Sequence, residues 1–242
     1  MTDLSLMKYF IGIEVEQFKK GFFICQYKYA RDSLKICKHV LTPVAIGTKL
    51  SKDDEGPNVN PTLFKRMVGS LMYATSTSPN IMQGASLISR FMETPKDTHW
   101  RVGKRIMRYI TRTINLACCI MYAIIEKKDL IGYTDSDFVG SLNDRKSTSR
   151  YVFRLGSSVI SWASKKKPTM TPSLREEEYV ATTSTKYQIV WLRRLLDGLK
   201  QKQQGSSTIY SENTSMITLS KNSVFHQKSK HINTRYHFIE KL

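Results

Sequence analysis

The sequence predicts an α/β fold, with a β-hairpin and helices in its first half and a mixed sheet flanked by helices in its second half. Two observations lead to this prediction. Short apolar runs bounded by Gly, Ser and Asp alternate with longer segments of helical periodicity. In addition, 40% of the 242 residues are hydrophobic, which is enough for one large domain or two small ones.

The first 46 residues predict a β-hairpin. YFIGIEV and FFICQYKYA are two β-rich runs, and the basic turn between them contains Gly21. The first run begins almost at residue 1, so we expect a missing region N-terminal to it. The stretch GTKLSKDDEGPNVN, residues 47–60, has little apolar content and several breakers, which predicts a loop or linker.

A helix is predicted after this linker, with Asn60 as its N-cap and Pro61 in its first turn. Residues at helical spacing form one apolar face, which we expect in a core. These residues are Phe64, Met67, Val68, Leu71 and Met72.

A second helix is predicted between Pro95 and Thr113. Its expected buried side consists of Trp100, Gly103, Ile106 and Ile110. Its other side carries a stripe of arginines, which indicates either a solvated face or contacts with phosphates. Because the protein is so basic, we favour the interpretation that these arginines contact phosphates. The arginines are Arg101, Arg105, Arg108 and Arg112.

After residue 128 the pattern becomes three strands, a helix, a strand and a short helix. LIGYTD is one strand, and YVFRLGSSVISWAS predicts two strands joined through Gly156, Ser157 and Ser158. Ser173 and Glu176 resemble a capping box at the start of a long helix. STIYSEN and TSMITLSK complete the series. The expected core residues include Trp162, Tyr179, Val180, Ile189, Val190, Trp191, Leu192, Leu195 and Leu196.

The charge balance favours a polyanionic partner. Lys and Arg number 38 against 20 Asp and Glu, a net charge of +18, which makes nucleic acid the leading candidate. No apolar run approaches the roughly 20 residues of a membrane-spanning helix. The N-terminus lacks the pattern of a secretory signal, so we expect a nuclear or cytoplasmic protein. The four cysteines have no zinc-site spacing and are expected as reduced thiols.

Carboxylates occur where strands end and where a helix starts. Asp135 and Asp137 follow the first strand, Glu178 lies at the helix start beside two other glutamates, and Glu212 follows the later strand. If they converge in an α/β sheet, their mutual repulsion implies a bound metal, and hard oxygen ligands select Mg²⁺ or Mn²⁺. The alternative is that they are ordinary turn and capping residues.

Long motifs carry a family resemblance. The run IGYTDSDFVGSLNDRKSTSRYVFRLGSSVISWASKKKPT, then EEEYVATTS, WLRRLL, IYSEN and VFHQKSKHINTRYHFI, resembles the ribonuclease H domain of copia-type retrotransposons. KYFIGIEV, FKRMVGSLMYATSTSPNI and SRFMETPKDTHWRVGKRIMRYI resemble the end of the reverse transcriptase and its connection in the same polyproteins. The resemblance implies a reverse transcriptase remnant at 1–46, a linker and helical connection at 47–115, and a ribonuclease H-like domain at 116–242.

The resemblance also implies a site. Asp135, Glu178 and Glu212 would be the catalytic carboxylates holding two Mg²⁺ ions, or Mn²⁺, against an RNA:DNA hybrid. The family usually has Asp at position 212, and it has a fourth, peripheral Asp where this chain has Asn233. Glu212 moves its charge outward by one methylene and Asn233 removes a charge, so we expect hydrolysis to be strongly impaired. The resemblance also implies that His231 belongs to a family motif near the nucleic-acid cleft.

Several interpretations remain open. Lys165, Lys166 and Lys167 form a basic group after a strand; we favour a solvated turn, with phosphate contact and a nuclear import signal as alternatives. No aromatic-x-Asp-Asp motif occurs, so we expect no polymerase activity. The chain is accordingly a weak ribonuclease, a non-catalytic nucleic-acid-binding relic, or a fragment that yields no stable protein because an exposed strand edge favours aggregation.

Overall fold

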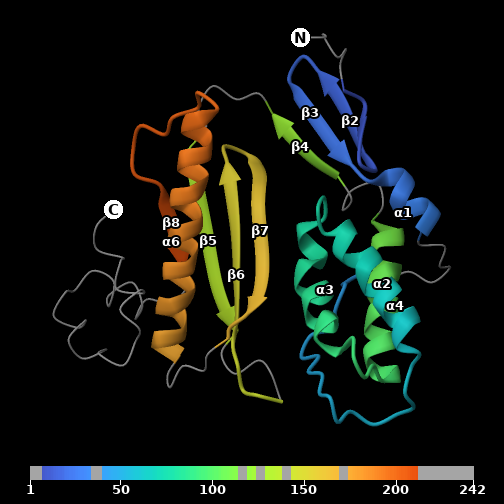
Figure 1. Ribbon diagram of the computed structural model, residues 1–242. Coiled ribbons are helices and arrows are strands. Elements are labelled where there is room, and N and C mark those ends of the chain that lie inside the picture. Colours follow the sequence, from blue (N-terminus) through green and yellow to red (C-terminus); the bar gives the residue numbers. More distant parts are fainter. Residues whose placement is uncertain are drawn as a thin grey trace. The chain divides into compact units, whose positions relative to one another are not determined.

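The structure is a computed structural model that describes residues 7–33, 40–113, 119–123, 129–137, 143–168 and 174–211 (Figure 1). Its contacts divide the chain into two compact units, Met1–Ile124 and Ile125–Leu242. This division follows residue 124, whereas the sequence analysis drew a boundary at residue 116. The difference arises because strand β4, Cys119–Ala123, pairs with a strand of the first unit. Among the described residues, no helix is long and apolar enough to cross a membrane.

The first unit contains the predicted hairpin as part of an antiparallel sheet. Lys19 and Lys20 link the two strands of the hairpin, and Phe18 faces Gly21 across the turn. The second strand ends earlier than predicted, because a helix begins at Tyr27 and buries Ala30 in the core. In the order of the sheet, the strands are β1 (Tyr9–Phe10), β2 (Ile13–Phe18), β3 (Gly21–Cys25) and β4.

The helix predicted after the linker is α2, Pro61–Ala74. The side chain of Asn60 caps it by accepting hydrogen bonds from the backbone N–H groups of Thr62 and Leu63, at 2.9 and 3.3 Å. The predicted buried face is confirmed except at Met72, which is 42% exposed because it lies at the edge of that face. The other helices of this unit are α1 (Tyr27–Ser33), η1 (Pro79–Ile81), α3 (Met82–Ile88), η2 (Ser89–Phe91) and α4 (Asp97–Arg112).

Helix α4 corresponds to the second predicted helix. Gly103, Ile106 and Ile110 are buried on it as predicted, and Trp100 is half-buried. A Cβ atom at Gly103 would collide with the side chain of Met67, so the glycine allows α4 to approach α2 closely. The core of the first unit is therefore helical, and it joins Phe64, Met67, Val68, Leu71, Ile81, Ile88, Phe91, Ile106 and Ile110.

The second unit has the predicted order of three strands, a helix and a strand. The sheet order is β7-β6-β5-β8, in which β5 pairs antiparallel with β6 and parallel with β8. Gly156 has a φ of 59° in the turn between β6 and β7, a conformation that glycine adopts without strain. The short helix predicted in TSMITLSK lies outside the described residues. The elements are β5 (Leu130–Asp137), β6 (Thr148–Leu155), β7 (Ser158–Lys166), α6 (Leu174–Gly198) and β8 (Thr208–Ser211).

Helix α6 lies along one face of this sheet, next to β5 and β8 (Figure 1). Leu130 and Phe153 of the sheet pack against Ile189, Leu192 and Leu196 of the helix. The prediction that Trp191 and Leu195 are buried was wrong, since they are 54% and 46% exposed. These two residues are four positions apart and share the outer face of the helix. Trp162 on β7 is half-buried.

Candidate functional site

The pleat of β5 separates its side chains into two sets. Leu130, Gly132 and Thr134 are buried toward α6, and the alternation places Asp135 and Asp137 on the opposite face of the sheet. Arg150 is the register partner of Asp135 on β6. The side chains of Asp135 and Asp137 are 54% and 48% exposed, so both carboxylates are accessible to solvent and to a ligand.

One guanidinium bridges the two aspartates. Nη1 of Arg150 lies 3.1 Å from Oδ2 of Asp135, and Nη2 lies 3.6 Å from Oδ2 of Asp137. Arg150 therefore supplies the positive charge that the sequence analysis assigned to a metal ion. The sequence analysis did not identify Arg150, because its position opposite Asp135 depends on the register between β5 and β6. Among the described residues, no group of three or more His, Cys, Asp or Glu could hold a metal ion.

The start of α6 carries the acidic residues of the predicted site. Glu177 is fully buried, and Glu178 belongs to the helix but its side chain lies outside the described set. Two helical turns after Glu178, Thr185 donates a hydrogen bond from its hydroxyl to that of Thr134, at 3.0 Å. The face of α6 that carries Thr185 thus contacts the residue that directly precedes Asp135.

The parallel pairing of β5 and β8 brings a third segment near Asp135. Thr134 of β5 is the register partner of Ser211, the last residue of β8. Glu212 follows Ser211 in the sequence and lies outside the described residues. Asn233 and His231 also lie outside them. The convergence of Asp135, Glu178 and Glu212 therefore stays a prediction.

The arginines of α4 lie on the side predicted for them, but two of them have partners within the first unit. Arg101 pairs with Asp97 at 2.6 Å. Arg105 donates hydrogen bonds to the carbonyl and hydroxyl oxygens of Thr42, at 3.2 and 2.9 Å. Arg112 is exposed and Arg108 is half-buried. Two of the four arginines therefore make contacts within the first unit, and the stripe also carries positive charge at the surface of α4.

Lys165 and Lys166 of the basic group are the last residues of β7, so the prediction of a solvated turn was wrong for them, because both pair with β6. Their side chains lie in two different environments. Lys165 is exposed. Nζ of Lys166 lies 2.7 Å from Oδ1 of Asp144, and the two residues form an ion pair. The side chain of Asp144 is only partly exposed. Since Lys165 and Lys166 are adjacent in a strand, their side chains point to opposite faces of the sheet. Phosphate binding by these lysines stays a prediction.

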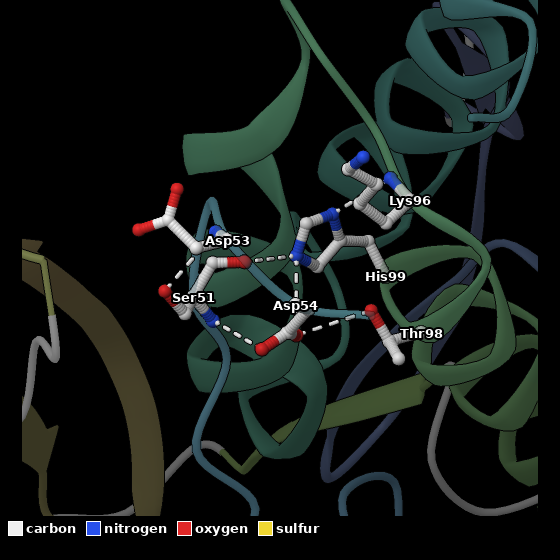
Figure 2. Close-up of polar contacts among 6 residues, drawn as sticks. All are labelled: Ser51, Asp53, Asp54, Lys96, Thr98 and His99. Carbon is white, nitrogen blue, oxygen red and sulfur yellow. Dashed lines mark hydrogen bonds and ion pairs between the residues drawn. The ribbon is translucent and has the colours of Figure 1, made fainter. Parts of the chain in front are cut away.

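In the first unit, a second polar cluster connects the predicted linker, residues 47–60, to the start of helix α4. Figure 2 shows the fully buried imidazole of His99 between Ser51, Asp54 and Lys96. Its Nδ1 accepts a hydrogen bond from the backbone N–H of Lys96 at 3.0 Å, and its Nε2 donates to the carbonyl of Ser51 at 2.9 Å. This pattern requires the neutral ring with its proton on Nε2.

Burial lowers the pKa of His99 below 6.5, and the nearby charge of Lys96 acts in the same direction. The hydrogen bond to Ser51 and the charge of Asp54 raise the pKa but do not outweigh burial. Asp54 also accepts hydrogen bonds from the backbone N–H of Ser51 and the hydroxyl of Thr98, both at 3.1 Å (Figure 2). The cluster thus anchors the linker, and the sequence analysis missed it because a single histidine carries no motif.

Comparison with known proteins identifies relatives along nearly the whole chain. No protein-family model matches. A retrovirus-related Pol polyprotein from transposon TNT 1-94 of Nicotiana tabacum is 36% identical over 100% of this chain and 19% of the relative. Two Pol polyproteins from Arabidopsis thaliana, from transposons RE2 and RE1, are 34% and 35% identical over 96% and 99% of this chain, and each match covers 16% of the relative.

The chain therefore spans less than a fifth of the length of these relatives. The match to the Nicotiana tabacum relative covers both units of the chain. The chain belongs to the Pol polyproteins of copia-type retrotransposons.

Proposed function

We propose that the second unit is a ribonuclease H-type domain that hydrolyses the RNA strand of RNA:DNA hybrids at a strongly reduced rate. The observation that carries the proposal is the position of Asp135 on β5, between antiparallel β6 and parallel β8. The residues that directly precede Asp135 and Glu212 in the sequence, Thr134 and Ser211, are register partners, and Thr134 also contacts α6. This pairing and this contact make β5, β8 and α6 neighbours, which supports the proposal that their carboxylates converge.

The donor chemistry fits Mg²⁺ or Mn²⁺ in part. Carboxylate oxygens are the ligands that these hard cations prefer, and Asp135 is accessible. Asp135, Glu178 and Glu212 would hold the ions. Bound Mg²⁺ supplies a Lewis acid that lowers the pKa of a water and stabilises the leaving oxygen in phosphodiester hydrolysis. Arg150 opposes this arrangement, because its guanidinium already pairs with both Asp135 and Asp137 and would repel a cation bound there.

The second candidate function is binding of nucleic acid without hydrolysis. The Arg150 bridge favours it, since a guanidinium paired with both aspartates reduces their mutual repulsion and so the electrostatic need for a cation. The net charge of +18 remains available to attract the phosphate backbone. In this form the domain would bind hybrids with an affinity that falls steeply as salt increases, and it would show no Mg²⁺-dependent turnover.

Cleavage of a labelled RNA:DNA hybrid by the 242-residue chain tests the proposal. With Mg²⁺, we expect slow cleavage that is lost in Asp135→Asn and retained in Asp197→Asn. Asp197 is a matched control because it is an exposed aspartate near the other end of α6. Cleavage at the same rate in the parent and in Asp135→Asn would contradict the proposed site. Salt-dependent binding by a parent that shows no cleavage would favour the second candidate.

A further inference from the structure

The face of the second sheet opposite α6 contains a hollow. Its volume is about 530 Å³, within the range of about 300–1,000 Å³ that small-ligand sites occupy. The lining residues lie on β5, β6 and β8. The alternation of the strands places five of their side chains on this face. These residues are Tyr133, Asp135, Arg150, Val152 and Tyr210.

Two tyrosines form the aromatic wall of the hollow. Tyr133 and Tyr210 are register partners on β5 and β8, and their rings stack with centroids 5.4 Å apart and an angle of 22° between the planes. They are 38% and 53% exposed. Stacking holds both rings in a fixed orientation without a ligand, so little side-chain freedom is lost when a planar group binds.

The stacked pair of tyrosines leaves room for a further ring on the side of Tyr210. Val152 lies next to Tyr133 in the register across the sheet. On the other side, β8 is the last strand of this sheet in the described part of the chain. The outer face of the Tyr210 ring is therefore free of a neighbouring strand among those residues. A planar ring placed there would extend the stack from Tyr133 through Tyr210 to the ligand.

The charges bordering the tyrosines favour a polyanion that carries planar rings. Asp135 and Asp137 would repel phosphates, but the Arg150 guanidinium that bridges them offsets one of their two negative charges. Arg154 is half-buried on the same face of β6, in register with Ile131. The whole chain has a net charge of +18, which attracts a phosphate backbone to it. A single-stranded polynucleotide has both features, because each unpaired base exposes a π-face for stacking.

We propose that Tyr133 and Tyr210 form a stacking platform for an unpaired base of single-stranded nucleic acid. The proposal rests on the proposed function only in taking nucleic acid as the ligand, and it requires neither a metal ion nor hydrolysis. The platform lies beside Asp135 on the same face, so a base bound there would position the adjoining phosphodiester near that carboxylate. Stacking on tyrosine is tolerant of base identity, so we expect little sequence preference.

Fluorescence anisotropy with a labelled single strand of about 12 nucleotides, in EDTA, tests the platform. The double variant Tyr133→Leu/Tyr210→Leu keeps apolar bulk but removes both rings, and we expect it to bind about 5- to 100-fold more weakly. The matching double variant with Phe keeps the rings and should bind like the parent. Tyr187→Leu, an exposed tyrosine on α6, is the control and should also bind like the parent.

An abasic strand of the same length separates stacking from attraction to the backbone. The parent should bind the base-bearing strand more tightly than the abasic strand, and the Leu double variant should bind both equally. The proposal is overturned if the parent shows no such preference, or if the Leu variant binds like the parent while circular dichroism shows that it is folded. Equal loss in the Phe and Leu variants would also overturn it. Because no metal is present, these results are independent of hybrid cleavage.

Discussion

Replacing Arg150 by Met should convert the bridged pair Asp135 and Asp137 into a stronger cation-binding site. Met keeps most of the length and apolar bulk of the arginine and removes its charge. The two ion pairs of Arg150 contribute little to the free energy of unfolding, because exposed ion pairs contribute about 0.2–1 kcal/mol each. Asp135 and Asp137 are about half exposed, so we expect the free energy of unfolding to fall by no more than about 1–2 kcal/mol. The variant should therefore fold.

The effect on metal binding should be larger. Two unit charges about 4 Å apart interact by about 1 kcal/mol in water-like surroundings, which apply to groups as exposed as these. A divalent cation would be repelled by twice that amount, so removing Arg150 should tighten Mg²⁺ or Mn²⁺ binding by about 2 kcal/mol, or about thirtyfold. Isothermal titration calorimetry with Mn²⁺ measures this change directly.

Arg154→Met is the matched control. Arg154 lies on the same strand and the same face, but its side chain contacts the carbonyl oxygen of Ser157, at 3.5 Å. We expect this variant to bind Mn²⁺ like the parent. Unchanged or weaker binding in Arg150→Met, or equal tightening in both variants, would refute the idea that the guanidinium occupies the place of a cation.

Three further predictions follow from single residues. Glu212→Asp restores the shorter side chain that the family usually has, and it should raise the rate of hybrid cleavage by up to about a hundredfold in single-turnover assays; no increase would contradict the explanation of impairment. Burial lowers the pKa of His99, so the unfolded chain takes up a proton more readily. The free energy of unfolding should therefore be highest above pH 6.5 and fall as the pH drops below 6.5 towards the folded-state pKa, a fall that urea titrations should find reduced in His99→Gln. A Cβ atom at Gly132 would approach the buried ring of Phe153 to 2.7 Å, so Gly132→Ala should cost about 1–3 kcal/mol in urea unfolding, with partial recovery in a double variant that also carries Phe153→Leu.

Local rules predicted much of the fold. Asn60 and Pro61 marked the start of α2 correctly, because capping depends on neighbouring residues alone. The strands of the second unit were predicted from turn residues such as Gly156, whose positive φ is also a local property. Helix α1 was missed because the aromatic residues of QYKYA favour a strand, whereas burial of Ala30 in the helical core favours a helix.

The site was less predictable, because its electrostatics depend on contacts between strands. Asp135 was identified as a candidate, but the sequence contains no signal that Arg150 faces it across β5 and β6. The stack of Tyr133 on Tyr210 likewise depends on the register of a parallel pair whose strands are separated in the sequence by β6, β7 and α6. Periodicity also left the width of the buried face of α6 undefined, which is why Trp191 was placed in the core.

Crystals of the chain soaked in Mn²⁺ give the most direct measurement of the central claim. Anomalous scattering locates the ion without reference to activity. We predict a peak within coordination distance, about 2.0–2.2 Å, of carboxylate oxygens from Asp135, Glu178 and Glu212, with Arg150 displaced. Carboxylates held on opposite faces of the sheet, with Arg150 still bridging Asp135 and Asp137 and no manganese between them, would contradict the account.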